Sequence, residues 1–364
     1  MNRRAFTLSA AGLAAAGSLF GADQDLAVGM IGVGGRGSFL LQNALNVPGV
    51  RILQICDIDP TNLDKALSAA VRDKPQGIAD YRKLLEKSDI QAVFIATPCY
   101  LHREMVIAAL QAGKNVYCEK PLALTPEDCR AIVEAAKHAK GILQVGFQRR
   151  YSPQTQEMIR RVRAGVIGKP LFIRGQYYTT KDLPHNQAWK FDRDKFGDML
   201  VEQAIHQFDL YNWILDSHPV RACGMGSANL LVNDPPGRTI MDHYSITYEY
   251  ANGAHVSFSH CYYAVGKLAT PTDIVFGEKG AISYDQAGIE FWDRKTNAAT
   301  DKISVNGDYL AATLAAVTAF VDNVRNHKHP VTDAELGRLA ALTVIMGERS
   351  MLKGRTVEWK EVDL

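Results

Sequence analysis

The chain has 364 residues, of which 47% are hydrophobic and 22% are charged, a composition typical of globular proteins with about two domains. Its net charge of +2, with no basic run beyond the first residues, argues against a nucleic-acid partner. The six cysteines include no Cys-x-x-Cys pair, so the sequence predicts no metal site. Several of them lie in apolar strand patterns, which favours buried thiols over disulfides.

The first 22 residues have the pattern of an export signal. Arg3-Arg4 precedes a weakly hydrophobic stretch from Leu8 to Phe20, which looks like a twin-arginine leader, a route that accepts folded, cofactor-loaded proteins. We therefore expect a periplasmic or exported protein; a disordered N-terminus is the alternative. The stretch is short of the about 20 strongly apolar residues of a membrane span. Cleavage after Ala22 and an uncleaved, membrane-tethered form both remain open.

Residues 23–148 alternate apolar runs with helical patterns, which predicts a doubly wound parallel α/β sheet of the Rossmann type. Residues 149–364 lack this alternation and are predicted to form a second domain, for substrate binding and oligomerisation. The strands expected in the first domain are Leu26–Ile31, Val50–Ile55, Ala92–Ala96 and Lys114–Cys118.

The first strand leads directly into a glycine-rich loop, Gly32-Val33-Gly34-Gly35-Arg36-Gly37, and a helix is expected from Ser38 to Ala44. In such a loop Gly32 forms the tight turn, Gly34 lets the backbone approach a pyrophosphate, and Gly37 permits close helix packing. The helix N-terminus then offers free N–H groups to the phosphates. This loop predicts a dinucleotide site that includes Gly35 and Arg36.

Asp57 ends the second strand, 25 residues after Gly32. A carboxylate at this position accepts hydrogen bonds from the adenosine ribose hydroxyls and repels the extra phosphate of NADP. Ile58 follows, with no Arg or Lys beside it. NAD is therefore favoured over NADP, although Arg36 could still reach the adenosine side.

Two further loops follow the third and fourth strands. Thr97-Pro98 ends the third strand, and His102 opens the next helix. The fourth strand ends at Glu119-Lys120-Pro121, ahead of a helix start at Thr125-Pro126. Ligands of doubly wound sheets bind along this carboxyl edge, so we expect Lys120 close to the nicotinamide.

In order and spacing, these segments resemble the Gfo/Idh/MocA oxidoreductases. The matching segments are the glycine loop, Asp57, Thr97-Pro98 with His102, Glu119-Lys120-Pro121, Gly146-Phe147-Gln148-Arg149-Arg150-Tyr151, Gly280 and Gly354-Arg355. The resemblance covers essentially the whole chain after the leader. It implies that Thr97, Pro98, His102, Glu119 and Lys120 belong to the cofactor site.

The second half has the strand pattern that this family implies. Asn252-Gly253 is a hairpin turn signal between two strands, and we expect an open, mainly antiparallel sheet with helices on one face. Helices over residues 309–326 and 332–352 carry apolar stripes typical of packing elements, the first through Leu310, Leu314, Val317, Val321 and Val324. Family members often associate through the other sheet face, so a homodimer or homotetramer is expected. The four predicted strands are Leu171–Tyr178, Val220–Gly226, Tyr244–Tyr250 and His255–Tyr262.

The predicted chemistry lies at Glu202, His206 and Asp209. On one helix, residues at i, i+4 and i+7 point the same way. The family has an acidic residue and a histidine at this spacing, facing the nicotinamide, and the acid is commonly aspartate. The extra methylene of Glu202 casts doubt on carrying over any specific substrate. We assign His206 as the base and Lys120 as the group that holds the reacting oxygen. Glu202 is expected to orient His206 or a neighbouring hydroxyl, and Asp209 to serve structure.

Five side chains are candidates for a polyol pocket, because aromatic faces and hydrogen-bond donors suit a sugar. Glu119 is equally consistent with orienting Lys120 and with touching substrate. The five pocket candidates are Arg149, Tyr177, His185, Trp189 and Lys190.

Three hypotheses for function follow. The first is an oxidoreductase on a hydroxyl of a sugar, polyol or glycoside that recycles its bound NAD. The second is a redox-neutral, NAD-dependent glycoside hydrolase; relatives of that kind typically have a tyrosine three residues before the histidine, where this chain has Gln203. The third is a nucleotide-bound protein without catalysis, against which the presence of both Lys120 and His206 argues.

Overall fold

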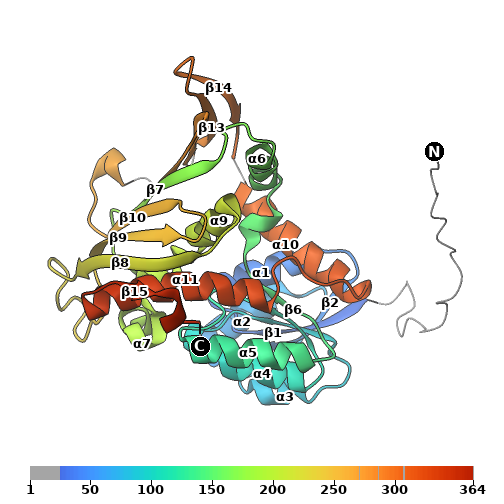
Figure 1. Cartoon of the computed structure of the whole chain (residues 1–364). Helices are drawn as coiled ribbons and strands as arrows, with labels where there is room; N and C mark the ends of the chain where they lie inside the picture. Colours follow the sequence, from blue (N-terminus) through green and yellow to red (C-terminus); the bar gives the residue numbers. More distant parts are fainter. Residues whose placement is uncertain (1–24, 270, 286, 306–307, 364) are drawn as a thin grey trace, which may run out of the picture.

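The computed structural model describes residues 25–269, 271–285, 287–305 and 308–363. The predicted leader, residues 1–22, lies outside the described residues. Within those ranges, no helix combines the length and apolar character needed to cross a bilayer. Figure 1 shows two sheets, one above the other in this view, with α11 (Ala334–Lys353) running between them.

The first sheet has six parallel strands in the order β3-β2-β1-β4-β5-β6. The order reverses between β1 and β4, which is where ligands of doubly wound sheets bind. The predicted Rossmann sheet is therefore confirmed, and the carboxyl ends of β1, β4 and β5 share one edge. Its strands are β1 (Leu26–Ile31), β2 (Val50–Cys56), β3 (Gln76–Ile78), β4 (Ala92–Ile95), β5 (Asn115–Cys118) and β6 (Leu143–Val145).

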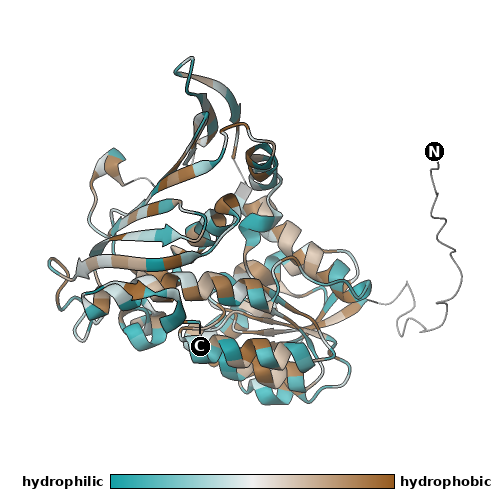
Figure 2. Cartoon of the chain, in the orientation of Figure 1, coloured by the Kyte–Doolittle hydropathy of each residue, from teal (hydrophilic) through white to brown (hydrophobic). Residues whose placement is uncertain are grey.

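Helices connect these strands, and side-chain caps mark several of their starts. Thr125 accepts a hydrogen bond from the Asp128 amide, as its cap pattern predicts. Helix α1 starts at Gly35, three residues before the predicted Ser38, because the glycines themselves adopt helical geometry. These helices are α1 (Gly35–Leu45), α2 (Pro60–Ala69), α3 (Tyr81–Leu85), α4 (His102–Gln111) and α5 (Pro126–His138). In Figure 2, α4 and α5 carry both hydrophobic and hydrophilic residues, as expected for helices with one buried face.

The second sheet has nine strands in the order β14-β13-β12-β11-β7-β10-β9-β8-β15. Only β7 and β10 pair in parallel; the other neighbours are antiparallel, as predicted. The four predicted strands correspond to β7 (Pro170–Tyr178), β8 (Pro219–Ser227), β9 (His243–Tyr250) and β10 (His255–Cys261). The others are β11 (Thr272–Gly277), β12 (Gly280–Asp285), β13 (Gly288–Asp293), β14 (Ala298–Ile303) and β15 (Val357–Glu358).

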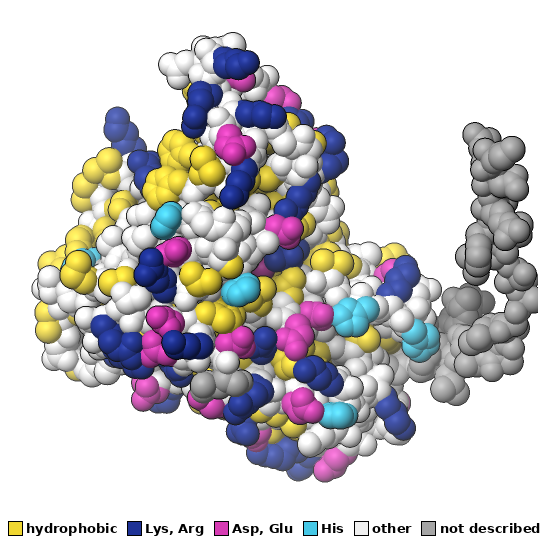
Figure 3. All heavy atoms as spheres, viewed as in Figure 1, with side chains coloured by type: hydrophobic (Ala, Val, Ile, Leu, Met, Phe, Trp, Pro, Cys, Tyr) yellow, Lys and Arg dark blue, Asp and Glu magenta, His cyan; other side chains and the backbone are white. Residues whose placement is uncertain are grey.

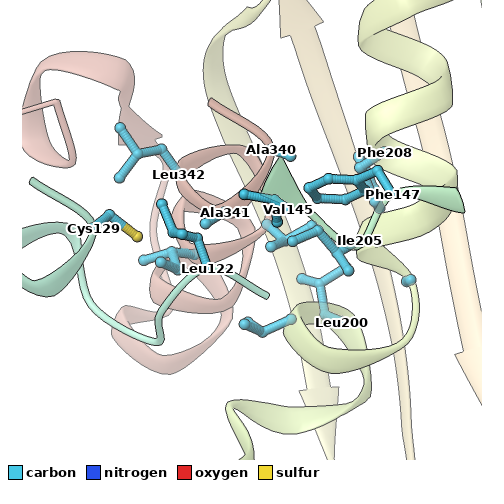
Figure 4. Close-up of a cluster of buried hydrophobic side chains, with 14 of the residues drawn as sticks. Leu122, Cys129, Val145, Phe147, Leu200, Ile205, Phe208, Ala340, Ala341 and Leu342 are labelled. Atoms are coloured by element: carbon cyan, nitrogen blue, oxygen red, sulfur yellow. The ribbon is translucent and has the colours of Figure 1, made fainter. Parts of the chain in front are cut away.

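The remaining helices cover one face of this sheet or, in the case of α10, pack on the first sheet. They are α6 (Pro153–Arg163), α7 (Arg193–Phe196), α8 (Asp198–Glu202), α9 (Ile205–Leu215), α10 (Asp308–Arg325) and α11. Figure 4 shows their shared core: Leu122 and Phe147 from loops of the first sheet meet Ile205, Phe208 and Ala341. Because this core is close-packed, the loop after β5 and the start of α9 hold fixed positions relative to each other.

Helix α10 packs on the first sheet, but its apolar stripe is shorter than predicted. Val317, Val321 and Val324 are buried beside Phe320 in the core of that sheet. Leu310 and Leu314 are 58% and 38% exposed, because the first two turns extend beyond this core. The start of α10 lies instead over the glycine loop, as its contacts with Arg36 show.

Four of the six cysteines are buried as predicted, and none of the six is in a disulfide in the described part of the chain. Cys223 is exposed and Cys261 is half-buried, because both lie on the uncovered face of the second sheet. On the face seen in Figure 3, basic and acidic side chains are interspersed.

Glu348, on α11, is a buried carboxylate whose Oε1 has no hydrogen-bond partner among the described residues. Burial, with repulsion from the buried Asp198, raises the pKa of Glu348 to about 8. The folded protein therefore binds a proton that the unfolded chain releases near its ordinary pKa, so stability falls as pH rises from about 4.5 to about 8.

We expect Glu348→Gln to remove most of this decrease in the free energy of unfolding between pH 4.5 and about pH 8, which is at most about 5 kcal/mol. Chemical denaturation at pH 5 and pH 9 measures the free energy of unfolding of the parent and the variant. Glu86→Gln, at an exposed position, is the control. An equal pH dependence in Glu348→Gln and the parent protein would contradict the assignment.

Candidate active site

The glycine loop forms an open cradle at the end of β1. Gly32 has φ of +82°, a conformation that favours glycine. A Cβ at Gly37 would collide with the carbonyl oxygen of Gly32, whereas Gly35 faces open space. Among the described residues, no side chain caps α1, so the amides of its first turn are available to a phosphate.

Asp57 lies at the end of β2 and is tied to this cradle. Its Oδ2 accepts a hydrogen bond from the Val33 amide at 2.7 Å, and its Oδ1 accepts one from the Asp59 amide at 2.9 Å. The neighbouring Ile58 is 88% exposed. The half-buried carboxylate keeps further acceptor positions, which is what a ribose diol requires.

Arg36 does not extend toward the adenosine side, the alternative that the sequence left open. Its Nε donates to Glu119 Oε1 at 2.8 Å, across the sheet edge from Asp57. Burial opposes the charge, but the Glu119 carboxylate raises the pKa of Arg36. Glu119 therefore pairs with Arg36, and it does not orient Lys120 as one reading of the sequence suggested.

His102 is buried beneath the two loops that carry Thr97-Pro98 and Lys120-Pro121. Its Nδ1 lies 2.8 Å from the Pro121 carbonyl oxygen, and its Nε2 lies 3.1 Å from that of Thr97. Burial lowers the pKa of His102. Both ring nitrogens face backbone carbonyls, so His102 positions the two loops.

Lys120 and Glu202 form a mostly buried ion pair. Lys120 Nζ donates to Glu202 Oε1 at 2.7 Å and to the Glu202 carbonyl oxygen at 2.5 Å. Burial lowers the pKa of Lys120, but the Glu202 carboxylate outweighs it and the net pKa is raised, which keeps Lys120 charged. Glu202 Oε2 has no partner among the described residues. The longer acidic side chain thus holds Lys120, whereas the sequence predicted that it orients His206 or a neighbouring hydroxyl.

The single helix predicted for Glu202, His206 and Asp209 is in fact two. Helix α8 ends at Glu202 and α9 begins at Ile205. The Glu202 carbonyl oxygen, which would accept the His206 amide in a continuous helix, accepts Lys120 Nζ instead, and the His206 amide bonds to Gln203. The prediction of one shared helix face was therefore wrong.

His206, in the first turn of α9, is held against the edge of the Phe147 ring, with ring centroids 6.1 Å apart. Its Nδ1 is buried without a hydrogen-bond partner in the described part of the structure. Burial lowers the pKa of His206 well below its usual value, and the charges of Lys120, Arg149 and Arg36 lower it further. The imidazole is therefore neutral at pH 7 and free to accept a proton.

Asp209 has the structural role that the sequence suggested. Its carboxylate accepts three hydrogen bonds from the Arg150 guanidinium, at 2.8 to 3.0 Å. That guanidinium also lies over the Trp213 ring. The pair joins α9 to the segment after β6, so it fixes the helix that carries His206.

Of the five pocket candidates, the structure brings four to this site. Tyr177, at the end of β7, lies within electrostatic range of Arg149, Glu202 and Lys120. Lys190 lies over the Trp189 ring, and burial lowers its pKa although Glu202 opposes this. The exposed His185 ring is within 4 Å of Asp182 and Asp234 and packs edge-on against Phe191.

Sequence reasoning missed two groups of residues. Tyr309 and Thr313, on α10, both accept hydrogen bonds from Arg36. Asp273 on β11 accepts from Gln207 at 2.8 Å and from the Tyr211 hydroxyl, which anchors α9 to the second sheet. These partners lie 62 to 277 residues apart along the chain, and no local motif marks them.

Comparisons with known proteins agree with this geometry. Residues 26–147 match the profile "Oxidoreductase family, NAD-binding Rossmann fold", and residues 155–283 match the "GFO/IDH/MocA C-terminal domain". Inositol 2-dehydrogenase of Salmonella typhimurium is 34% identical over 52% of this chain and 55% of its own length. The match therefore spans about half of that relative.

Two other relatives extend the comparison. The oxidoreductase YrbE of Bacillus subtilis is 30% identical over 72% of this chain and 75% of its own length. A solved levoglucosan dehydrogenase, in complex with NADH and levoglucosan, has the same fold, with a TM-score of 0.80 at 23% identity over 92% of this chain and 99% of that one. The chain belongs to the Gfo/Idh/MocA family of oxidoreductases.

Proposed function

We propose that this protein is an NAD-dependent oxidoreductase that acts on a hydroxyl group of a sugar, polyol or glycoside. One observation carries the proposal: a neutral His206, whose Nδ1 has no hydrogen-bond partner among the described residues, and a charged Lys120 adjoin the carboxyl edge that carries the glycine cradle. The inositol and levoglucosan dehydrogenases among its relatives support a polyhydroxylated substrate.

The described residues fit NAD. The glycine cradle and the uncapped start of α1 suit a pyrophosphate, and Asp57 suits the adenosine ribose. Arg36 is bonded to Glu119, away from Asp57, and so does not neutralise a 2′-phosphate there, which supports NAD over NADP. Thr97 and Pro98 border the nicotinamide half, at the end of β4.

A bound nicotinamide would accept the hydride that leaves the carbon carrying the reacting hydroxyl. The chain supplies the proton chemistry: His206 takes the hydroxyl proton, since its lowered pKa keeps it neutral. Lys120, held by Glu202, donates to the same oxygen and stabilises its developing negative charge. Arg149, Tyr177, Trp189 and Lys190 surround the remaining hydroxyls of the substrate.

We further propose that the protein is exported through its Arg3-Arg4 leader and retains its cofactor. An enzyme that works where free NAD is scarce must close its redox cycle on the protein, through a second substrate or a redox-neutral reaction. Gln203, in place of the tyrosine of the NAD-dependent glycosidases, supports the first route.

Two measurements test this function. Mass spectrometry of the nucleotide released by denaturing the purified protein is expected to find NAD in stoichiometric amount after extensive dialysis. A panel of sugars, cyclic polyols and aryl glycosides is then assayed with and without added NAD. Net NADH, or a paired reduced sugar, supports oxidoreduction, whereas free aglycone without net NADH indicates hydrolysis. Turnover of no panel member by NAD-loaded protein would overturn the proposal.

A further inference from the structure

The Arg36 side chain joins three segments that are distant in the sequence. It starts in the first turn of α1, and its Nε donates to Glu119 Oε1 at 2.8 Å, at the end of β5. Its Nη1 donates to the Tyr309 hydroxyl at 3.0 Å and to Thr313 Oγ1 at 3.4 Å, both on α10. One guanidinium therefore connects the glycine loop, the sheet edge and a helix from the C-terminal part of the chain.

This network lies across the path of a bound dinucleotide. In the first sheet β4 lies between β1 and β5, so the bond from Arg36 to Glu119 passes over the end of β4. A nucleotide with its pyrophosphate at the glycine loop and its nicotinamide near Lys120 crosses the same edge. Arg36 Nη2 is buried and has no partner within the described ranges, which leaves a charged donor available to a phosphate or ribose oxygen.

The start of α10 is held in place by two side chains of α1, Arg36 and Phe39. The Phe39 and Tyr309 rings stack, with centroids 5.7 Å apart and planes 13° apart. The Arg36 guanidinium carbon lies 5.5 Å and 5.7 Å from the centres of these two rings, within the range of cation–π attraction. Further along α10, Val317 and Phe320 are buried in the core of the first sheet. The C-terminal part of the helix is therefore anchored in this core, and its first turns contact α1.

We propose that Arg36, Glu119, Tyr309 and Thr313 form a latch that slows release of the dinucleotide. The inference rests on the proposed function, because it requires NAD or NADH as the occupant. Departure of the nicotinamide half requires Arg36 to give up a charge-assisted bond to Glu119 and two bonds to α10. The latch thereby gives a structural basis for a cofactor that remains bound between turnovers.

The competing explanation is that Arg36 only fastens α10 to the first domain. A fastening role predicts that loss of these bonds lowers the melting temperature and leaves the rate of nucleotide dissociation unchanged. A latch predicts a faster dissociation rate, whatever the change in melting temperature. The two explanations therefore separate on a kinetic measurement.

In the experiment, the purified protein is loaded with NADH and freed of excess nucleotide. It is then mixed with excess NAD, and the loss of the fluorescence of bound NADH gives the dissociation rate. Tyr309→Phe removes the hydroxyl but keeps the ring. We expect it to accelerate release about tenfold, equivalent to about 1.4 kcal/mol. Arg36→Lys keeps the charge but lacks the planar guanidinium with its several N–H donors, so it is expected to accelerate release further.

Tyr263→Phe is the matched control, because Tyr263 is a partly exposed tyrosine in the loop after β10, where its ring lies beside His243 of β9. Its dissociation rate is expected to equal that of the parent protein. If the parent binds NADH and Tyr309→Phe and Arg36→Lys release it at the parental rate, the latch is overturned and the proposed function stands. If the parent binds neither NADH nor NAD, the proposed function fails, and the latch fails with it.

Discussion

Replacement of His206 by asparagine is expected to lower kcat by about 10² to 10⁴-fold, the range for loss of a general base. The variant is expected to retain bound NAD, because among the described residues no hydrogen bond joins His206 to the glycine cradle or to Asp57, which would hold the phosphate and ribose ends. Single-turnover reduction of the bound NAD by substrate measures the chemical step directly, and mass spectrometry measures the cofactor.

The pH profile adds a second test of His206. A base accepts a proton only when it is neutral, so activity is lost as pH falls through the pKa of His206. Burial and the nearby charges of Lys120 and Arg149 hold that pKa well below 6.5. We therefore expect the acid limb of kcat to lie well below pH 6.5 and to disappear in His206→Asn.

The exposed His255 provides the control for this variant. His255→Asn is expected to keep the parental kcat and acid limb. Parental turnover in His206→Asn would exclude His206 as the base and direct attention to Lys120.

The second large effect is expected for Lys120. Lys120→Met should lower kcat/KM by about 10² to 10³-fold, the range for loss of one donor to a developing oxyanion. It should also move the acid limb of the profile to higher pH, because the Lys120 charge is one cause of the lowered pKa of His206. A merely structural lysine would not produce this shift.

Stability needs separate attention in this variant, since Glu202 loses its partner. Breaking a buried ion pair costs about 3 to 5 kcal/mol, and the pair is 9% and 14% exposed. The double variant Lys120→Met with Glu202→Gln removes the unpaired charge and is expected to recover most of the melting temperature without recovering activity. Recovery of both would assign Lys120 a structural role only.

Several elements of the fold were predictable because local patterns determine them. The apolar runs that stop just before Gly32, Asp57 and Glu119 are properties of short segments, and in the structure each of these runs is a strand. The Asn252-Gly253 turn and the Thr125 cap are equally local. The predicted NAD site and its site residues follow from the same motifs.

The errors have a common physical cause. Helical spacing alone placed Glu202, His206 and Asp209 on one face, but a lysine 82 residues away takes the Glu202 carbonyl oxygen and ends the helix. Leu310 and Leu314 extend beyond the core that buries the rest of their stripe. Each outcome depends on a partner that is distant in the sequence.

The sequence by itself determined the doubly wound sheet, the glycine cradle with Asp57, and the identity of the polar residues at the sheet edge. These depend on propensities and spacings within about 30 residues, the length of one βαβ unit. Only the tertiary structure decided that Glu202 holds Lys120, that His102 supports two loops, and that Arg36 connects Glu119 to α10. Hydrogen bonds and charges act over a few ångströms in space, whatever the distance along the chain.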